Sequence, residues 1–377
     1  LHLLSRRQRQ MCIRDRVTTL DLGLDARFFN DALGVTFDWY NRTTSDILTT
    51  ANLPATLGAD APYENMGTIQ TKGWELAIDY RHTFKNGLHF GVTASVADDK
   101  TEVTKWTYNT KIPSYGATGW WDKSAYKEGM VLGDIWGLQF DRFLTEDDFN
   151  ADGSLKAGLP DQTKVFPAGY QFAPGDVLYK DLDNNGEIVK QTNTNDRGDL
   201  SVIGNALPRL QFGLNLDAAW KGFDISMFFQ GVAKRKLWAA GNQVLPGFTT
   251  GEPFYKGAED YWTPENTDAF YPRPMDYKQS ASGNYSVNDR YLLNMAYLRL
   301  KTFTVGYSLP KVWLSKFKVQ GLRVYFTGEN LFTIDGVKPA IDPEIGIRTA
   351  SGKSDQRNFG RSYPYQKTVS FGIQLSL

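Results

Sequence analysis

The chain has 377 residues, and its 42 basic and 42 acidic side chains give a formal net charge of zero, which argues against a nucleic-acid-binding protein. One cysteine, Cys12, excludes a disulfide framework, and three histidines leave little for a zinc enzyme. No apolar run approaches the ~20 residues of a membrane helix. A β-barrel stays possible, because its signal is alternation within strands.

Residues 1–16 differ from everything that follows them. They hold five arginines, one acidic residue and the only cysteine, and they show no strand pattern. The stretch resembles a translated sequencing adaptor and lacks the apolar core of a signal peptide. We therefore predict that 1–16 is not native, with a natural basic arm as the alternative. The fold is assigned to 17–377.

Strict two-residue periodicity runs through the rest of the chain and predicts long β-strands. In the last segment, for example, Val369, Phe371 and Ile373 share one face while serine, glycine and glutamine occupy the other. Nine segments show the pattern: 20–24, 33–39, 74–80, 88–96, 210–220, 223–229, 297–309, 322–326 and 369–377. Between Leu300 and Phe303 the phase slips by one residue, which predicts a β-bulge. Almost no helix is expected.

The connections between these strands alternate between short and long. Short turns are predicted at 29–32, 84–87, 221–222 and 310–321. Long connections are predicted at 44–72, 99–208, 233–296 and 333–366. The alternation holds if a strand-like piece near 135–143 belongs to the second long connection. Short turns at one end and long loops at the other are typical of an outer-membrane barrel.

The apolar face of such strands could meet lipid or a second sheet. A soluble β-sandwich also alternates, but its strands usually have about 5–6 residues. The predicted strands of ~10–12 residues instead suit a tilted membrane span. Aromatic residues near strand ends, such as Trp39 and Trp220, are consistent with interfacial girdles. We predict an antiparallel transmembrane β-barrel, with the sandwich as the alternative.

The sharpest chemical motif begins at Asp181 and matches the first half of an EF-hand loop. Oxygen-bearing side chains stand at positions 1, 3 and 5, a glycine stands at position 6, and position 7 would supply a backbone carbonyl. The closing acid is missing, because position 12 is Thr192, and either Asp196 or Asp199 could replace it. We predict a structural calcium site, against the alternative of a solvated turn. Its residues are Asp181, Asp183, Asn185, Glu187 and Asp196.

Aromatic residues also gather in the long connections. Trp120, Trp121 and Trp262 are candidates for stacking on sugar rings or apolar substrates. The alternative is that these rings pack the loops against one another. Adjacent acids such as Asp147 and Asp148 do not form a recognisable acid–base pair, and no phosphate-binding loop or Ser–His–acid set is present. We therefore predict no catalytic residues and no enzyme.

Four stretches of the chain resemble one family. They are the strand entry Asn65-Met-Gly-Thr-Ile-Gln-Thr-Lys-Gly-Trp-Glu, the segment from Gly175-Asp176 to Asn205, the hairpin strand from Lys221 to Gly231, and the C-terminal stretches 297–310 and 322–332 with Asp342-Pro-Glu344. From about Val17 onward the chain is similar to the C-terminal barrel half of SusC/RagA-type TonB-dependent outer-membrane transporters of Bacteroidota. The insert at 190–195 and the final Leu377 depart from the family pattern.

The resemblance implies transport and not chemistry. In this family a plug fills the barrel, TonB supplies energy, and a SusD-like lipoprotein covers the mouth; the cargo is a glycan or a peptide. Nine strands cannot enclose a plugged lumen, which takes about 22. We therefore expect the C-terminal part of a larger barrel in the cell outer membrane, without its plug and with open edges near 18–28 and 367–377. A non-energised porin and a soluble carbohydrate-binding module are the alternatives.

Overall fold

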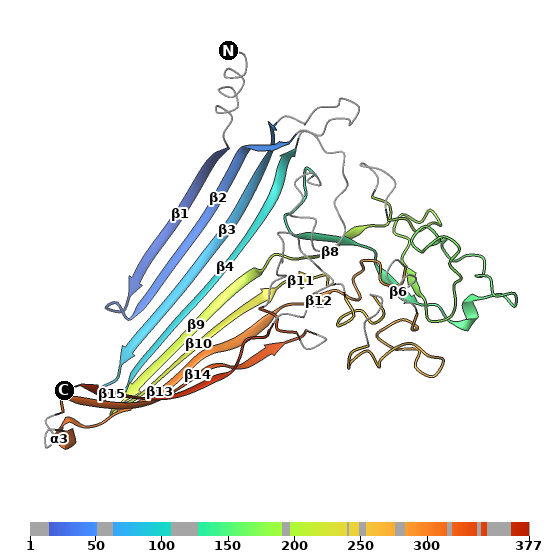
Figure 1. Cartoon of the computed structure of the whole chain (residues 1–377). Helices are drawn as coiled ribbons and strands as arrows, with labels where there is room; N and C mark the ends of the chain where they lie inside the picture. Colours follow the sequence, from blue (N-terminus) through green and yellow to red (C-terminus); the bar gives the residue numbers. More distant parts are fainter. Residues whose placement is uncertain are drawn as a thin grey trace, which may run out of the picture.

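The structure is a computed structural model that describes residues 15–50, 63–106, 127–190, 197–239, 241–248, 254–275, 283–314, 319–337, 341–344 and 363–376. Its main feature is one large antiparallel sheet (Figure 1). The nine strands are β1 (Arg16–Phe28), β2 (Leu33–Thr50), β3 (Tyr63–Thr83), β4 (His89–Trp106), β9 (Arg209–Trp220), β10 (Phe223–Lys234), β13 (Tyr297–Ser308), β14 (Gly321–Asp335) and β15 (Thr368–Ser376). All nine predicted strands are confirmed.

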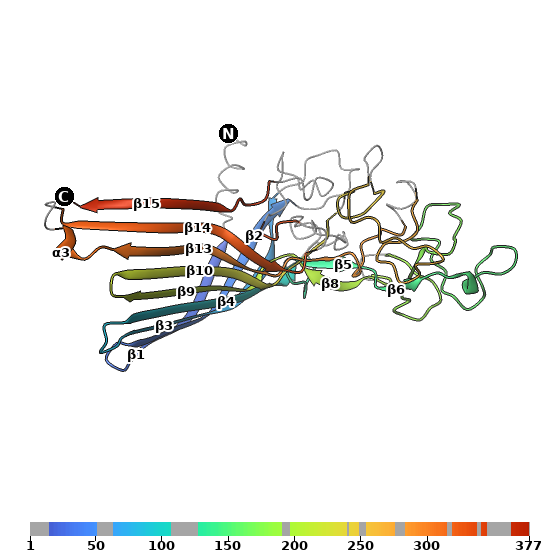
Figure 2. The same ribbon diagram turned by 90° about the horizontal axis from the view of Figure 1, so that it is seen from below.

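Neighbours in the sheet follow the chain order, from β1 at one edge to β15 at the other. The strand-like piece near 135–143 is not in this sheet, as predicted. The short turns all lie at one end of the strands, and the long connections extend from the other end (Figures 1 and 2). β15 ends at the same end of the sheet as the short turns. The edges of β1 and β15 have no neighbour among the described strands, so the sheet is open.

Two local predictions are confirmed in detail. Lys221 and Gly222 both have positive φ, 49° and 90°, which is the backbone of the tight hairpin turn that matches strand twist. On β13, Leu300 pairs with Phe332 and Thr302 with Glu329, while Lys301 has no partner in the ladder. The register therefore shifts at the place where the alternation slips.

Three strands, β2, β3 and β4, extend further at their loop ends than predicted. β2 and β4 have 18 residues each and β3 has 21, so they run into the expected connections 44–72 and 99–208. These extensions are rich in threonine, whose branched side chain favours a pleated surface without apolar alternation. The hydroxyls of Thr71 and Thr101, for example, pair across β3 and β4 at 2.8 Å. An alternation test stops at the last apolar residue and misses such polar strand ends.

One face of the sheet carries uncovered apolar side chains. Leu20, Leu22 and Leu24 on β1 and Phe371 and Ile373 on β15 are all exposed. A sandwich would bury this face under a second sheet, but all nine long strands described lie in one sheet. The sandwich alternative is therefore wrong, and the apolar face suits lipid. No helix in the described part of the chain is long and apolar enough to cross a bilayer.

The long connections fold into a separate cluster at one end of the sheet. It contains the short pairs β5 (Asp134–Gly137) with β8 (Ser201–Asn205), β6 (Phe140–Phe143) with β7 (Val177–Tyr179), and β11 (Lys236–Leu237) with β12 (Leu293–Asn294). The short helices are η3 (Glu146–Asp148) in this cluster and α3 (Lys311–Leu314) at the turn end. Most buried apolar residues lie in the loop cluster and not between the strands.

The start of β1 falls within the stretch predicted to be non-native. Arg16 pairs with Ser45 on β2, and its guanidinium contacts the Asp46 carboxylate at 2.5 Å. The first strand therefore begins one residue before the predicted boundary at 17. Residues 1–14 lie outside the described residues.

Candidate functional site

The predicted calcium loop follows β7 in the loop cluster. Carboxylate oxygens of Asp181, Asp183 and Asp199 lie within 4.8 Å of one another. Asp199 is fully buried, and its two oxygens accept hydrogen bonds from the backbone amides of Leu182 and Val189, at 2.7 and 2.8 Å. The fold therefore places Asp199 beside the two predicted acids. Through these two hydrogen bonds its carboxylate joins both ends of the turn.

Backbone geometry shapes the turn between these acids. Asn184 and Gly186 have positive φ, 58° and 85°, and the Gly186 amide donates to Asp181 Oδ2 at 2.8 Å. The other oxygen, Asp181 Oδ1, is buried and accepts no hydrogen bond from the described residues. Partial desolvation together with the neighbouring carboxylates of Asp181 and Asp199 raises the pKa of Asp183. A cation bound between these carboxylates would favour their ionised form and offset their mutual repulsion.

The remaining predicted ligands are placed differently. Asn185 Oδ1 accepts a hydrogen bond from the Glu187 amide at 2.7 Å, and the Glu187 carboxylate forms an ion pair with Lys164. The Glu187 side chain is thus directed to a lysine and is not in the acidic group, while its backbone carbonyl, the predicted ligand at position 7, stays a prediction. Asp196 lies outside the described residues. Asp199, the other acid considered for closing the loop, is in the acidic group.

Of the three tryptophans predicted to contact substrate, the structure describes one, Trp262. Trp262 is 7% exposed and packs in a core with Val165, Phe166 and Val177. Gly175, with a φ of 89°, lets the ring approach closely, because a Cβ there would lie 2.5 Å from Trp262 Cε3. The structure therefore favours the packing alternative for Trp262. Trp120 and Trp121 lie outside the described residues.

A buried polar hub that sequence reasoning missed holds three loop segments together. The fully buried Asp176 carboxylate accepts hydrogen bonds from Tyr170 Oη at 2.8 Å, Arg273 Nε at 2.8 Å and Asn284 Nδ2 at 2.9 Å. Desolvation and the Asp176 charge raise the pKa of Tyr170, so its hydroxyl stays a donor. Partners about 100 residues apart leave no local signal for such a hub.

A second charged network ties a loop to the wall of the sheet. Arg299 on β13, whose side chain is 4% exposed, contacts Asp342 at 2.6 Å and forms an ion pair with Glu344. Lys301, the bulge residue, contacts Glu344 at 3.0 Å. The Tyr365 ring lies 5.4 Å from the Arg299 guanidinium carbon and 4.7 Å from Lys301 Nζ. Pairing offsets the desolvation of these charges, so the network pins 342–344 to the sheet.

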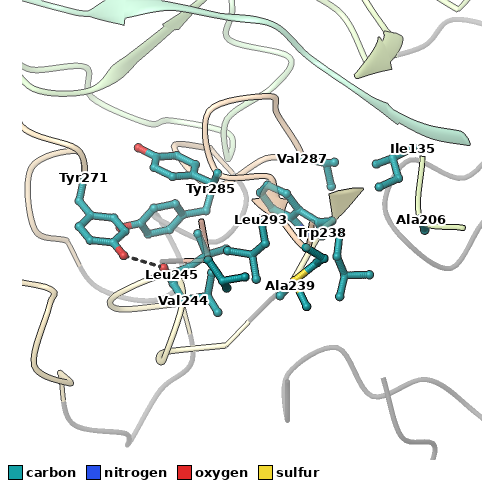
Figure 3. Packing of buried hydrophobic residues seen from close by; sticks show 14 residues of the cluster. Ile135, Ala206, Trp238, Ala239, Val244, Leu245, Tyr271, Tyr285, Val287 and Leu293 are labelled. Carbon is teal, nitrogen blue, oxygen red and sulfur yellow. Dashed lines mark hydrogen bonds between the residues drawn. The ribbon is translucent and has the colours of Figure 1, made fainter. Parts of the chain in front are cut away.

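The loop cluster also has its own apolar core. Figure 3 shows it from Tyr271 and Tyr285 at one end to Ile135 and Ala206 at the other. The Tyr271 hydroxyl donates to the Val244 carbonyl at 3.0 Å. The long connections therefore form a packed, folded unit at one end of the sheet. The sheet, with its face of uncovered apolar side chains, has the form of a segment of β-barrel wall.

Comparison with known proteins agrees with this class. Residues 15–172 match a family described as "TonB dependent receptor-like, beta-barrel". The chain is 28% identical to TonB-dependent receptor P3 of Formosa agariphila, covering 94% of this chain and 33% of the relative. It is 23% identical to TonB-dependent receptor SusC of Bacteroides thetaiotaomicron, covering 96% of this chain and 32% of the relative. The chain thus spans about a third of these relatives.

Solved structures show the same fold. The RagAB peptide transporter superposes with a TM-score of 0.66 at 19% identity, over 96% of this chain and 35% of that chain. The "open-open" state of the RagAB peptide importer gives a TM-score of 0.64. The chain is thus similar in sequence to TonB-dependent receptors, SusC among them, and its sheet has the fold of part of the RagAB β-barrel. The matched proteins are receptors and transporters, in agreement with the non-enzymatic prediction.

Proposed function

We propose that this chain forms part of a TonB-dependent transporter that imports a glycan or a peptide across the bacterial outer membrane. The observation that carries the proposal is one open sheet with an uncovered apolar face and a folded loop cluster at a single end. Lipid suits the apolar face, and the loop cluster suits cargo capture at the mouth. The similarity to TonB-dependent receptors supports energy coupling through TonB.

The proposed partners are TonB, a SusD-like surface lipoprotein and outer-membrane lipid. SusC and RagAB are the relatives that support a lipoprotein partner. The assignment of 17–377 to the C-terminal part of the barrel, and of 1–16 to an adaptor, belongs to the same proposal. The runner-up is a non-energised porin, since strands with short turns at one end and long loops at the other are also typical of a porin.

One experiment separates these two functions. Cells that express the complete receptor are compared with receptor-deleted and TonB-deleted cells for uptake of fluorescent maltoheptaose and of fluorescent tryptic casein peptides. We expect uptake of one probe to be lost in both deletions. Uptake that needs the receptor but not TonB would identify a porin. Copurification of a lipoprotein with the tagged receptor tests the partner.

We also propose that calcium stabilises the loop at Asp181, Asp183 and Asp199. The support is the convergence of three carboxylates, with Asp181 Oδ1 buried and without a donor among the described residues. Calcium binds six to eight oxygens in flexible geometry, and the Asn185 and Asp196 side chains remain candidates for further ligands. Trp120 and Trp121 remain candidates for contacting cargo.

A further inference from the structure

A cavity of about 590 Å³ opens in the loop cluster, on the connection between β11 and β12. This volume lies within the range of small-ligand sites. Exposed rings of Phe254, Tyr255 and Tyr261 form its wall, and Tyr271 and Tyr285 form its floor. Three prolines also line the cavity: Pro246, Pro272 and Pro274.

The floor of the cavity consists of the two packed aromatic rings of Tyr271 and Tyr285. Tyr271 and Tyr285 both pack on Tyr291, with ring centroids 6.1 and 5.3 Å apart, and all three belong to the apolar core of the loop cluster. The Tyr271 hydroxyl points into the protein, to the Val244 carbonyl (Figure 3). Burial raises the pKa of Tyr271 to about 12, so the hydroxyl stays neutral. A ligand on this floor therefore meets few hydrogen-bonding groups.

The wall is open to solvent. Phe254 is 60% exposed and Tyr261 is 41% exposed, whereas the adjacent Trp262 is buried. Large rings that stay uncovered beside a preformed floor mark a binding surface. Lys256 and Glu259 are the charged residues of the lining, so the cavity offers one charge of each sign and no net charge.

We propose that this cavity binds a peptide through an apolar ring-bearing side chain such as phenylalanine or proline. At the Tyr271 and Tyr285 floor the hydroxyls of a sugar would give up hydrogen bonds to water and find few replacements, which costs free energy. An apolar ring has no such hydrogen bonds to give up. Grooves lined by aromatic rings are surfaces on which extended, proline-containing peptides dock. Lys256 and Glu259 match the opposite charges of peptide termini. The inference rests on the proposed function and names its cargo class.

The test uses the complete receptor that contains this chain, purified in detergent and titrated by calorimetry. The probes are the peptide Gly-Phe-Pro-Gly, the ring-free peptide Gly-Ser-Ser-Gly, and maltotetraose. The variants are Phe254→Ala and Tyr261→Ala, both in the exposed wall. Trp313→Ala, an exposed ring on α3 at the opposite end, is the matched control. Heat-modifiable migration on gels confirms folding of each variant.

We expect Gly-Phe-Pro-Gly to bind about tenfold more tightly than Gly-Ser-Ser-Gly. Each wall variant should weaken the binding of Gly-Phe-Pro-Gly about tenfold, as for a contact at the centre of a binding site. Trp313→Ala is expected to stay within about twofold. Equal affinity for both peptides, or unchanged affinity in the wall variants, would overturn the proposal. Maltotetraose binding that depends on the wall would assign a glycan site instead. TonB-independent uptake would overturn the transport function separately.

Discussion

Asp176 and Arg273, 97 residues apart in the chain, form a two-point ion pair inside the loop cluster. Arg273 Nε lies 2.8 Å from Asp176 Oδ1, and Nη2 lies 3.1 Å from Oδ2. The carboxylate is fully buried, while the Arg273 side chain is 26% exposed. This pair joins the segment before β7 to the long connection before β12, and the fold of the loop cluster therefore depends on it.

Replacing Asp176 with alanine should destabilise the loop cluster by about 3 kcal/mol, because it leaves Arg273 without its carboxylate and Asn284 without its acceptor. Limited proteolysis of the detergent-purified receptor should show faster cleavage in the loop-cluster segments 127–206 and 236–296, with the strands of the sheet uncut. Asp152→Ala is the control, since the Asp152 side chain is exposed and its hydrogen bonds to the described residues are local, to Ser154. Equal cleavage rates in the two variants would contradict the role of the hub.

A pH dependence follows from Asp148 and Arg142. The Arg142 guanidinium, at 2.6 Å, lowers the pKa of the Asp148 carboxyl. A folded pKa below the unfolded value of about 3.9 stabilises the protein above that value, and the contribution is lost as pH falls through the folded pKa. The melting difference between wild type and Asp148→Asn should therefore be largest near pH 7 and vanish at acid pH. Asp147→Asn, at an exposed neighbour, should show no such difference.

Calcium should stabilise the loop only while its acids are present. At a calcium concentration of 100 times Kd, binding would add about 2.7 kcal/mol to the stability of the folded loop. We expect a higher melting temperature in calcium than in chelator for wild type, and no difference for Asp181→Ala with Asp183→Ala. Glu187→Ala serves as a comparison, because its carboxylate pairs with Lys164 outside the acidic group. Identical melting of wild type in calcium and in chelator would exclude the metal.

Gly67 provides a packing test on the loop side of the sheet. It is the register partner of Trp106, and a Cβ at Gly67 would lie 2.1 Å from Trp106 Cε3. Because Trp106 is buried, its ring cannot easily move, and Gly67→Ala should cost about 1–3 kcal/mol by overpacking. Gly321→Ala is the control, since its nearest atoms are 3.6 Å away.

A double-mutant cycle shows whether the clash is the cause. Adding Trp106→Ala to Gly67→Ala removes the ring, so the cost of the alanine at 67 should fall toward zero in that background. Unfolding in urea, followed by tryptophan fluorescence and by gel mobility, measures each corner of the cycle. A cost of Gly67→Ala that stays the same without the ring would point to backbone effects.

The site was only partly predictable from the sequence. Asp181 and Asp183 could be predicted to lie together because a metal loop places its ligands at alternate positions within one turn, a local rule. Asp199 was one of two alternatives in the sequence, and its place beside these acids comes from the fold, which returns it to the loop amides. The contacts of Asp176 with Arg273 and Asn284 and of Arg299 with Asp342 were not predicted, since these partners lie 43 to 108 residues apart. Trp262 was predicted in a loop, but its burial depends on segments distant in sequence.

By itself the sequence determined the nine strands, the tight turn at Lys221 and Gly222, the bulge at Lys301 and the separation of short turns from long loops. These features follow from side-chain alternation and turn chemistry within a few residues. The tertiary structure decided how far β2, β3 and β4 extend and how the connections pack into one unit. It also decided which rings are buried and which line a cavity. Those outcomes depend on contacts between distant segments, and no local periodicity encodes them.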